Sequence, residues 1–328
     1  MITTLCRAMY DFDIASVQNA LDQCFAPDAT LHLCHPFGDV IGPSAFLETA
    51  LVPLHRALPD LERRDWIKVD GITEQGDHWI GCGGYYTGRF EKPFLDIPPT
   101  GHQAHMRFHE YYRIVEGRVV ETQMIWDIPE LMLQAGAWPM APSLGREWLT
   151  PAPATQDGLG PHDAAHSQGS MAVVTEMLEY LVKHPTEGGP EVMEAERFWH
   201  PRMSWYGPAG IGTARGFQAF RDWHQIPFLN AMPDRGQNRD GTNGHFFAEG
   251  NYVAVTGWPN MKQSLTGDGW MGIAPTGSPV ELRSLDFWRV EDGLIRENWV
   301  LVDLLDLYRQ VGVDVFARLR EFNKARRN

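Results

Sequence analysis

The chain has 328 residues, of which 42 are acidic and 28 are basic, and its net charge at neutral pH is near -14. This charge opposes binding to nucleic acid or to an anionic membrane, because like charges repel. No run approaches the roughly 18 apolar residues of a membrane span, and the N-terminal MITTLCRAMYDFD carries acids where a signal peptide needs an apolar stretch. A soluble cytoplasmic protein is therefore expected.

The first third of the chain opens with a helical pattern, because apolar residues recur at helical spacing from Ile14 onward. A short strand is expected over 29–33. A second helix should begin after Gly42 and be interrupted by Pro53, which cannot donate a backbone hydrogen bond. The rest of this region is typical of strands, beginning with the run over 78–90.

The second half of the chain repeats this order. Apolar residues at helical spacing follow Ser170, a candidate N-cap, and a strand is expected over 203–207. The next helix should begin after Gly216 and be interrupted by Pro227, and strands should resume at 252–259.

This similarity is a tandem duplication. Residues 97–136 and 273–312 superimpose without a gap, with IPPTG opposite IAPTG and QAG opposite QVG. A period this long exceeds the roughly 20 to 50 residues of solenoid repeats, so each copy should be a complete domain. We expect one domain over 1–136, a linker rich in Pro and Gly over 137–169, and a second domain over 170–328.

Each copy should end in a hairpin with a two-residue turn. An acidic residue followed by Gly lies between alternating apolar runs at 116–117 and at 292–293, and this pair suits a turn that needs positive φ. Counting outward pairs Glu110 with Gln123 in the first copy and Asp286 with Trp299 in the second. A one-residue bulge would instead exchange the two faces of the hairpin.

By this count, one face of each hairpin carries carboxylates among apolar side chains. In the first copy this face holds Met106, Phe108, Glu110, Tyr112, Gln123, Ile125 and Asp127, and in the second it holds Leu282, Ser284, Asp286, Trp288, Trp299, Leu301 and Asp303. Desolvation raises the pKa of such acids toward neutral pH, where a side chain can both take and give a proton. The pattern therefore favours acid–base chemistry without a cofactor.

Each of the four acids also has a structural interpretation. Glu110 and Asp286 lie within strands, where a buried acid must be paired or used, so pairing with an arginine and catalysis both stay open. Asp127 and Asp303 each end a strand and precede a helix, so an N-cap role explains them as well.

Aromatic residues are candidates for the walls of two pockets. The second copy offers Trp205, His245, Trp258, Trp270, Trp288 and Trp299, whereas the first copy is more polar and offers Tyr85, Tyr112 and Gln123. Aromatic walls suit a planar polycycle or the apolar face of a sugar, although tryptophans also fill protein cores.

Other kinds of site find little support. Of the histidines at 102, 105 and 109, only His105 and His109 share a face of the expected strand, and no HExxH motif accompanies them. The four cysteines form no CxxC pair, so free thiols are expected. The glycines from Gly207 to Gly216 lack the lysine of a nucleotide-binding loop, and no GxSxG motif occurs. We expect neither a metal nor a cofactor.

These features together resemble a known family. The run YTGRFEKPFLDIPPTG, followed by a strand, the turn at Gly117 and ETQMIWD with a helix ending in LMLQAG, is similar to the SnoaL-like polyketide cyclases of the nuclear-transport-factor-2-like superfamily. The second copy resembles them through GDGWMGIAPTG and FWRVEDGLIRENWVLVDLLDLYRQVG. The resemblance implies an α+β protein with two tandem, cone-shaped domains, each a curved antiparallel sheet with packing helices.

The resemblance also implies a chemistry. In the family, an acid at the end of the last strand serves as acid and base in an intramolecular aldol ring closure, and by position this acid matches Asp127 and Asp303. Its single-domain members pair as dimers, so a tandem could form an internal pseudo-dimer, and a homodimer stays open.

The leading hypothesis is a cofactor-independent acid–base enzyme that acts on a small carbonyl-bearing molecule by aldol cyclisation, isomerisation or dehydration. Asp127 or Asp303 would transfer the proton, and Glu110 or Asp286 would assist. The alternatives are a hydrolase or hydratase that uses the same acid pair, and a non-catalytic protein that binds a small molecule.

Overall fold

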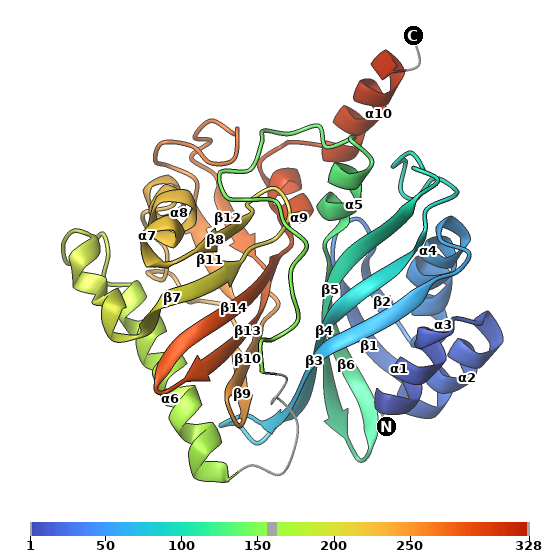
Figure 1. Cartoon of the computed structure of the whole chain (residues 1–328), viewed down its shortest axis with the longest axis horizontal. Helices are drawn as coiled ribbons and strands as arrows, with labels where there is room; N and C mark the ends of the chain where they lie inside the picture. Colours follow the sequence, from blue (N-terminus) through green and yellow to red (C-terminus); the bar gives the residue numbers. More distant parts are fainter. Residues whose placement is uncertain (1, 156–162, 327–328) are drawn as a thin grey trace. The chain divides into compact units, whose positions relative to one another are not determined.

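The computed structural model describes residues 2–155 and 163–326. The chain divides into two compact units, of which unit 1 comprises Met1–Lys68, Gly76–Pro139 and Asp303–Asn328, and unit 2 comprises Val69–Gln75 and Met140–Val302. Each copy of the repeat forms a six-stranded sheet with packing helices (Figure 1), which confirms the α+β class. No helix in the described ranges is long and apolar enough to cross a membrane.

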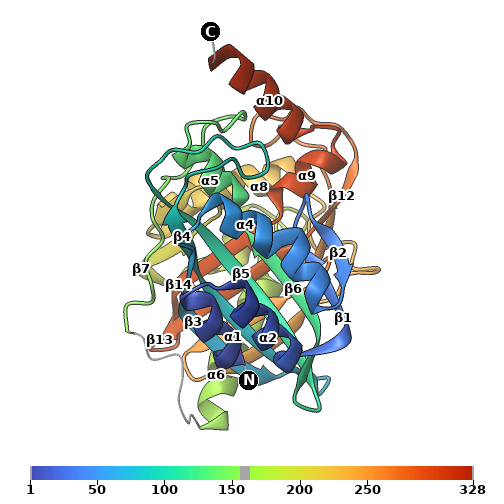
Figure 2. The same ribbon diagram turned by 90° about the vertical axis from the view of Figure 1, so that its right-hand side faces the viewer.

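The first copy begins with helices and ends with a long hairpin and a short helix. Its elements are α1 (Ile2–Tyr10), α2 (Ile14–Cys24), β1 (Phe25–Leu33), β2 (Gly38–Ile41), α3 (Pro43–Phe46), η1 (Leu47–Leu51), α4 (Val52–Ala57), β3 (Glu62–Ile72), β4 (His78–Arg89), β5 (Gln103–Val115), β6 (Arg118–Trp126) and α5 (Ile128–Gln134). The strand order is β2-β1-β6-β5-β4-β3, and helices α1 to α4 cover one face of this sheet (Figure 2).

The helices of the first copy follow from local sequence. The side chain of Asp13 accepts a hydrogen bond of 2.9 Å from the Ser16 amide and caps α2, so the helix predicted from Ile14 is confirmed. Pro53 lies in the first turn of α4, directly after the π-helical turn η1. The second copy places Pro227 after a π-helical turn in the same way. A wide turn accommodates a proline that has no N–H to donate, so the helix continues instead of stopping.

The second copy repeats the order of elements with more interruptions. They are α6 (Ala164–Leu181), η2 (Pro190–Met193), η3 (Ala195–Arg197), β7 (Trp199–Tyr206), β8 (Thr213–Arg215), α7 (Phe217–Phe220), η4 (Arg221–Gln225), α8 (Ile226–Ala231), β9 (His245–Glu249), β10 (Tyr252–Thr256), β11 (Met261–Ser264), β12 (Pro279–Leu282), β13 (Ser284–Glu291), β14 (Leu294–Val302), α9 (Leu304–Gln310) and α10 (Val315–Arg326). The strand order of the large sheet is β8-β7-β14-β13-β10-β9.

Two sequence expectations need correction here. Both large sheets are mixed, because β1 runs parallel to β6 and β7 runs parallel to β14. Ser170 is not an N-cap: α6 begins earlier, Asp163 caps it, and the Ser170 hydroxyl donates to the carbonyl of Gly250 at 2.8 Å.

The expected linker over 137–169 is only partly visible. Residues 137–155 contain no helix or ladder strand, residues 156–162 lie outside the described part of the chain, and residues 164–169 belong to α6.

The hairpin turns are confirmed, but the pairing counted from them is wrong. Val115 faces Arg118, and both Glu116 and Gly117 have positive φ. Further along, the register shifts by one residue in each copy, so Glu110 pairs with Met124 and Asp286 pairs with Val300. The cause is a β-bulge, which places two residues of one strand opposite one of its partner.

The two copies differ most in the strands that flank this hairpin. In the first copy β4 and β5 pair without a break from His78 to Arg89. In the second copy β10 pairs with β13 only over Tyr252 to Val255, and the chain continues into the separate two-stranded sheet of β11 and β12. Pro259 lies in the gap and cannot donate to a ladder.

Candidate functional site

A cavity in unit 2 lies where the second ladder is interrupted. It has a volume of about 100 Å³ and is lined largely by aromatic rings, those of Trp199, Trp205, Phe220, Phe228, Trp270 and Trp288. We call it the aromatic chamber. A second cavity of about 360 Å³, the polar vestibule, shares part of its wall with the chamber, including Arg235, Ser284 and Asp286. Asp286 therefore stands where the two spaces meet.

The carboxyl group of Asp286 is poised to exchange a proton. The Ser284 hydroxyl donates a hydrogen bond of 2.5 Å to its Oδ1. Burial raises the pKa of Asp286 to about 7, although Ser284 and the positive charge of Arg235 act in the opposite direction. Near neutral pH the group therefore populates both its protonated and its ionised form.

The chamber also holds polar atoms that lack protein partners. Nδ1 of His224, Oε1 of Gln225 and Nε1 of Trp288 are buried and have no hydrogen bond to any described residue. Burial, and then the charge of Arg235, lower the pKa of His224 to about 3, so its ring is neutral at pH 7. Buried polar atoms are normally hydrogen-bonded, so these three are available to a ligand.

His224 is held in place by aromatic packing. Its ring stacks on Trp205 with the centroids 3.8 Å apart and the planes inclined by 16°. Phe220 and Phe228, one helical turn to either side, contact the same ring at 5.6 and 5.8 Å.

The first copy has a hydrogen-bonded core at the corresponding strand position. The carboxylate of Glu110 accepts from the hydroxyls of Tyr86 and Tyr112, at 2.8 and 2.5 Å, and from Nε1 of Trp126 at 2.8 Å. Arg63 donates to it as well and forms a buried ion pair with it. A carboxylate offers about four acceptor positions, so this one is saturated by the protein.

Arg63 links this core to a second acid. Its Nη2 lies 3.0 Å from Oδ1 of Asp65. Burial opposes the charge of Arg63, but Asp65 and Glu110 together raise its pKa well above the ordinary value. Burial also raises the pKa of Tyr86 and of Tyr112, so both phenols stay protonated and donate to Glu110.

Comparison with protein families agrees with the duplicated architecture. The family model described as SnoaL-like polyketide cyclase matches residues 4–135 and, a second time, residues 189–311, together more than half of the chain. The chain belongs to the SnoaL-like polyketide cyclase family. This SnoaL-like chain thus contains two family domains in tandem, as its repeat predicted.

Solved structures similar to this SnoaL-like chain match about one copy at a time. Wild-type IdmH from Streptomyces antibioticus is 22% identical, over 41% of this chain and 95% of that chain, with a TM-score of 0.35. The SnoaL-like protein from Jannaschia sp. CCS1 is 14% identical, over 46% of this chain and 97% of its own, with a TM-score of 0.37. TsrD from Streptomyces laurentii is 25% identical, over 43% and 96%, with a TM-score of 0.33. A search of curated proteins gave no match.

The structure distributes the candidate residues of the second copy unevenly. Asp286, Trp205, Trp270 and Trp288 line the aromatic chamber. Trp299 pairs with Phe287 and so belongs to the opposite face of the sheet, where its Nε1 donates to the carbonyl of Pro151 at 3.1 Å. The remaining two, His245 in β9 and Trp258 beneath the guanidinium of Arg283, are absent from the walls of both cavities.

In the first copy, Glu110 and Tyr112 lie within the hydrogen-bonded core. Tyr85 pairs with Arg107 and Gln123 pairs with Tyr111, so both lie on the face of the sheet opposite Glu110.

The two aspartates that follow the last strands lie at helix starts. Asp303 accepts a capping hydrogen bond from the Asp306 amide at 3.2 Å, and it also accepts from the His35 amide at 3.0 Å. Asp127 has the N-cap position of α5 but makes no capping bond through its side chain, and its Oδ2 lies 3.5 Å from Nη2 of Arg107. Neither aspartate lines the aromatic chamber or the polar vestibule.

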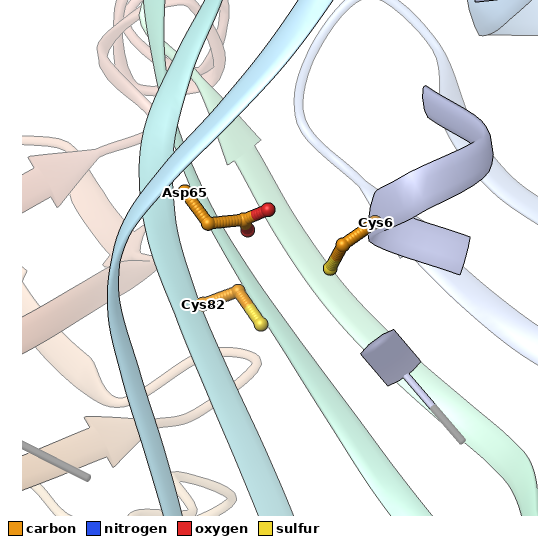
Figure 3. A group of neighbouring side chains, drawn as sticks. All are labelled: Cys6, Asp65 and Cys82. Carbon is orange, nitrogen blue, oxygen red and sulfur yellow. The ribbon is translucent and has the colours of Figure 1, made fainter. Parts of the chain in front are cut away.

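One group of side chains in unit 1 could hold a metal ion. Cys6 of α1, Asp65 of β3 and Cys82 of β4 place three ligand atoms within 4.8 Å of one another (Figure 3). The carboxylate of Asp65, however, already accepts from Arg63, and Nζ of Lys68 lies 3.7 Å from it. These two cations compete with a metal for the carboxylate. The three residues are far apart in the sequence, and no motif joins them.

Sequence reasoning missed His224, Gln225 and Arg235, and it placed Ser284 on the same face as Asp286 without giving it a role. A signal for the first of these exists, because Phe220, His224 and Phe228 recur every four residues and so share one face of a helix. No comparable signal marks Arg235, which lies in the irregular segment between α8 and β9.

Proposed function

We propose that the aromatic chamber of the second copy is the active site of a cofactor-independent acid–base enzyme, and that Asp286 carries the proton. The supporting observation is a carboxyl group with a pKa of about 7 in the wall of an aromatic cavity, beside unpartnered polar atoms. A group with this pKa is an efficient proton acceptor and donor near neutral pH.

The chemistry suited to this arrangement starts with a proton on a carbon next to a carbonyl group. Ionised Asp286 takes that proton, the C–H electron pair forms a carbon–carbon double bond, and the carbonyl oxygen gains negative charge. The indole N–H of Trp288, whose Nε1 is buried without a partner among the described residues, lines the same chamber and is a donor for that oxygen. The enolate carbon then attacks a second carbonyl of the same molecule, and protonated Asp286 returns its proton to the resulting alkoxide. Return of the proton to a different carbon gives isomerisation instead.

This proposal assigns the proton transfer to Asp286 and not to Asp303. The Asp303 carboxylate is engaged by two backbone amides, which are partners for a structural carboxylate.

The test follows exchange of ketone α-protons in D2O by proton NMR, with the single-ring ketones acetophenone and methyl 4-oxo-4-phenylbutanoate as probes. Asp286→Asn should lower the exchange rate at least about a hundredfold, because general acid–base catalysis contributes about 10² to 10⁴. Asp292→Asn, at an exposed hairpin turn that tolerates Asn, is the matched control and should exchange at the wild-type rate. Asp303→Asn should also keep most of the rate.

Binding of the ketones is measured in parallel by quenching of tryptophan fluorescence. A ketone that binds the chain but exchanges equally fast with wild type and Asp286→Asn would refute the proposal and favour a non-catalytic binding pocket.

A further inference from the structure

The wall of the polar vestibule has more cations than acids, whereas the chain as a whole is acidic. Its wall includes the cations Arg235, Arg239 and Lys262 and the acids Glu179 and Asp286, in a chain whose net charge is -14. Lys262 is already paired, since its Nζ lies 2.8 Å from Glu281. The two arginines are therefore the cations available to a ligand.

Arg235 is partly buried and lacks a close counter-ion. Within the described ranges its guanidinium makes no ion pair or hydrogen bond. Its guanidinium carbon lies over the ring of Phe228, 5.9 Å from the ring centroid. Burial lowers the pKa of Arg235 to about 10, although Asp286 acts in the opposite direction. A strong ion pair would instead raise the pKa of the arginine and lower that of Asp286. Asp286 is therefore not a close counter-ion of Arg235.

Arg239 adds a second positive charge in the same wall. It is exposed, makes no ion pair within the described residues, and its charge also contributes to the lowered pKa of Arg235. Two guanidinium groups that repel each other form a favourable site for an oxyanion, because one anion satisfies both and each guanidinium offers a planar set of N–H donors.

The segment that carries both arginines is shaped to pass close to α6. Gly236 has a φ of +77°, and a Cβ atom there would lie 2.4 Å from the side chain of Val182, another vestibule residue. Glycine at this position therefore lets the backbone bring Arg235 and Arg239 against the cavity.

We infer that the substrate carries an oxyanion, a carboxylate or a phosphate ester, which binds Arg235 and Arg239 in the polar vestibule while its carbonyl-bearing apolar part occupies the aromatic chamber. This inference rests on the proposed function, because it takes the chamber beside Asp286 as the place of reaction. A chamber of about 100 Å³ matches a single ring better than a polycycle, since a cavity of about 150 Å³ holds benzene.

The test compares three aryl ketones that share a benzoyl group: 4-oxo-4-phenylbutanoate, its neutral methyl ester, and 2-oxo-2-phenylethyl phosphate. Calorimetric titration of the full chain should show at least one anion binding about ten times more tightly than the ester, as expected for charge-assisted contacts to arginine. Tighter binding of the phosphate would identify a phosphate ester as the anion, and the reverse order would identify a carboxylate.

Arg239→Gln should reduce this preference several-fold, whereas Arg146→Gln should leave it unchanged. Arg146 is an exposed arginine of the same unit that lines neither cavity, so it is a matched control. Arg235→Lys keeps the charge but loses the planar donors, and should also reduce the preference.

Equal affinity for the anions and the ester, or a preference unaffected by Arg239→Gln, would overturn the inference. The ester separates this failure from failure of the proposed function. If the ester still shows α-proton exchange that depends on Asp286, the acid–base proposal stands and only the anion site is refuted.

Discussion

Glu110 in the first copy and Asp286 in the second occupy the same position of the repeated hairpin, yet their surroundings are opposite. Glu110 is fully buried and accepts from four protein donors, whereas Asp286 lines two cavities and accepts from Ser284. The same strand position thus supports a structural acid in one copy and a titrating acid in the other. The donors, charges and cavities around a carboxylate therefore determine whether it titrates near neutral pH, more than its position in the strand does.

Particular replacements explain the difference. In the alignment of the repeat, Phe108 and Trp126 of the first copy correspond to Ser284 and Val302 of the second, which are smaller. The strand segment that carries Arg63 also has no counterpart, because β9 begins only at His245. Replacement of two large side chains, together with the absence of a counterpart of Arg63, leaves space beside Asp286.

The largest effect on stability is expected from removing the buried ion pair between Arg63 and Glu110 in the first copy. Arg63→Met should lower the free energy of unfolding by about 3 to 5 kcal/mol, because it leaves Glu110 as a buried charge without its cation. The matched control is Arg64→Met, which removes an exposed ion pair to Glu62 and should cost about 1 kcal/mol or less. Urea denaturation followed by circular dichroism measures both. A loss below about 1 kcal/mol for Arg63→Met would show that Glu110 does not need this cation.

A smaller effect should appear in the pH dependence of stability. The pKa of Asp286 is about 7 in the folded chain and about 3.9 in an unfolded chain. Between about pH 4 and pH 7 the folded state holds a proton that the unfolded state has lost, so this contribution to stability falls as pH rises and levels off above pH 7.

Asp286→Asn removes that contribution. Relative to the variant, wild type should therefore lose about 2 to 4 kcal/mol between pH 4 and pH 8, at about 1.4 kcal/mol per pKa unit. Unfolding free energies at several pH values give the difference. If the two stabilities changed in parallel with pH, Asp286 would titrate near its ordinary pKa and the contrast with Glu110 would weaken.

The smallest effect concerns the hydrogen bond from Ser284, which favours the ionised form of Asp286. Ser284→Ala removes that bond, so the pKa of Asp286 should rise further, by about one unit. The midpoint of the rise of ketone exchange with pH should move upward by the same amount, with little change in the plateau rate. Ser278→Ala, outside both cavities, is the control. An unchanged midpoint would show that Ser284 does not tune this carboxyl group.

Much of the fold could be predicted because its signals are local or repeated. The helix from Ile14, the two hairpin turns and the tandem organisation all follow from spacing, turn chemistry and self-similarity. The face assignment of the hairpins failed because a bulge depends on sheet twist and packing, and no residue type announces it.

The site was less predictable for a similar reason. Asp286 could be singled out as an acid within an apolar strand, but its partners come from elements distant in sequence, such as the helical segment of His224 and the loop of Arg235. The saturation of Glu110 likewise depends on Arg63, whose strand lies well upstream. Such convergence is a property of tertiary structure that periodicity cannot show.

The membership of Asp303 in unit 1 has a consequence for the order of folding during synthesis. Unit 2 ends at Val302, so all its residues have been synthesised before α9 and α10 exist, whereas unit 1 needs those two helices and the contact of Asp303 with the His35 amide. The ribosome therefore completes the unit with the proposed active site first, although most of the other unit precedes it in the chain. This order is the reverse of the usual one, in which the N-terminal domain folds first.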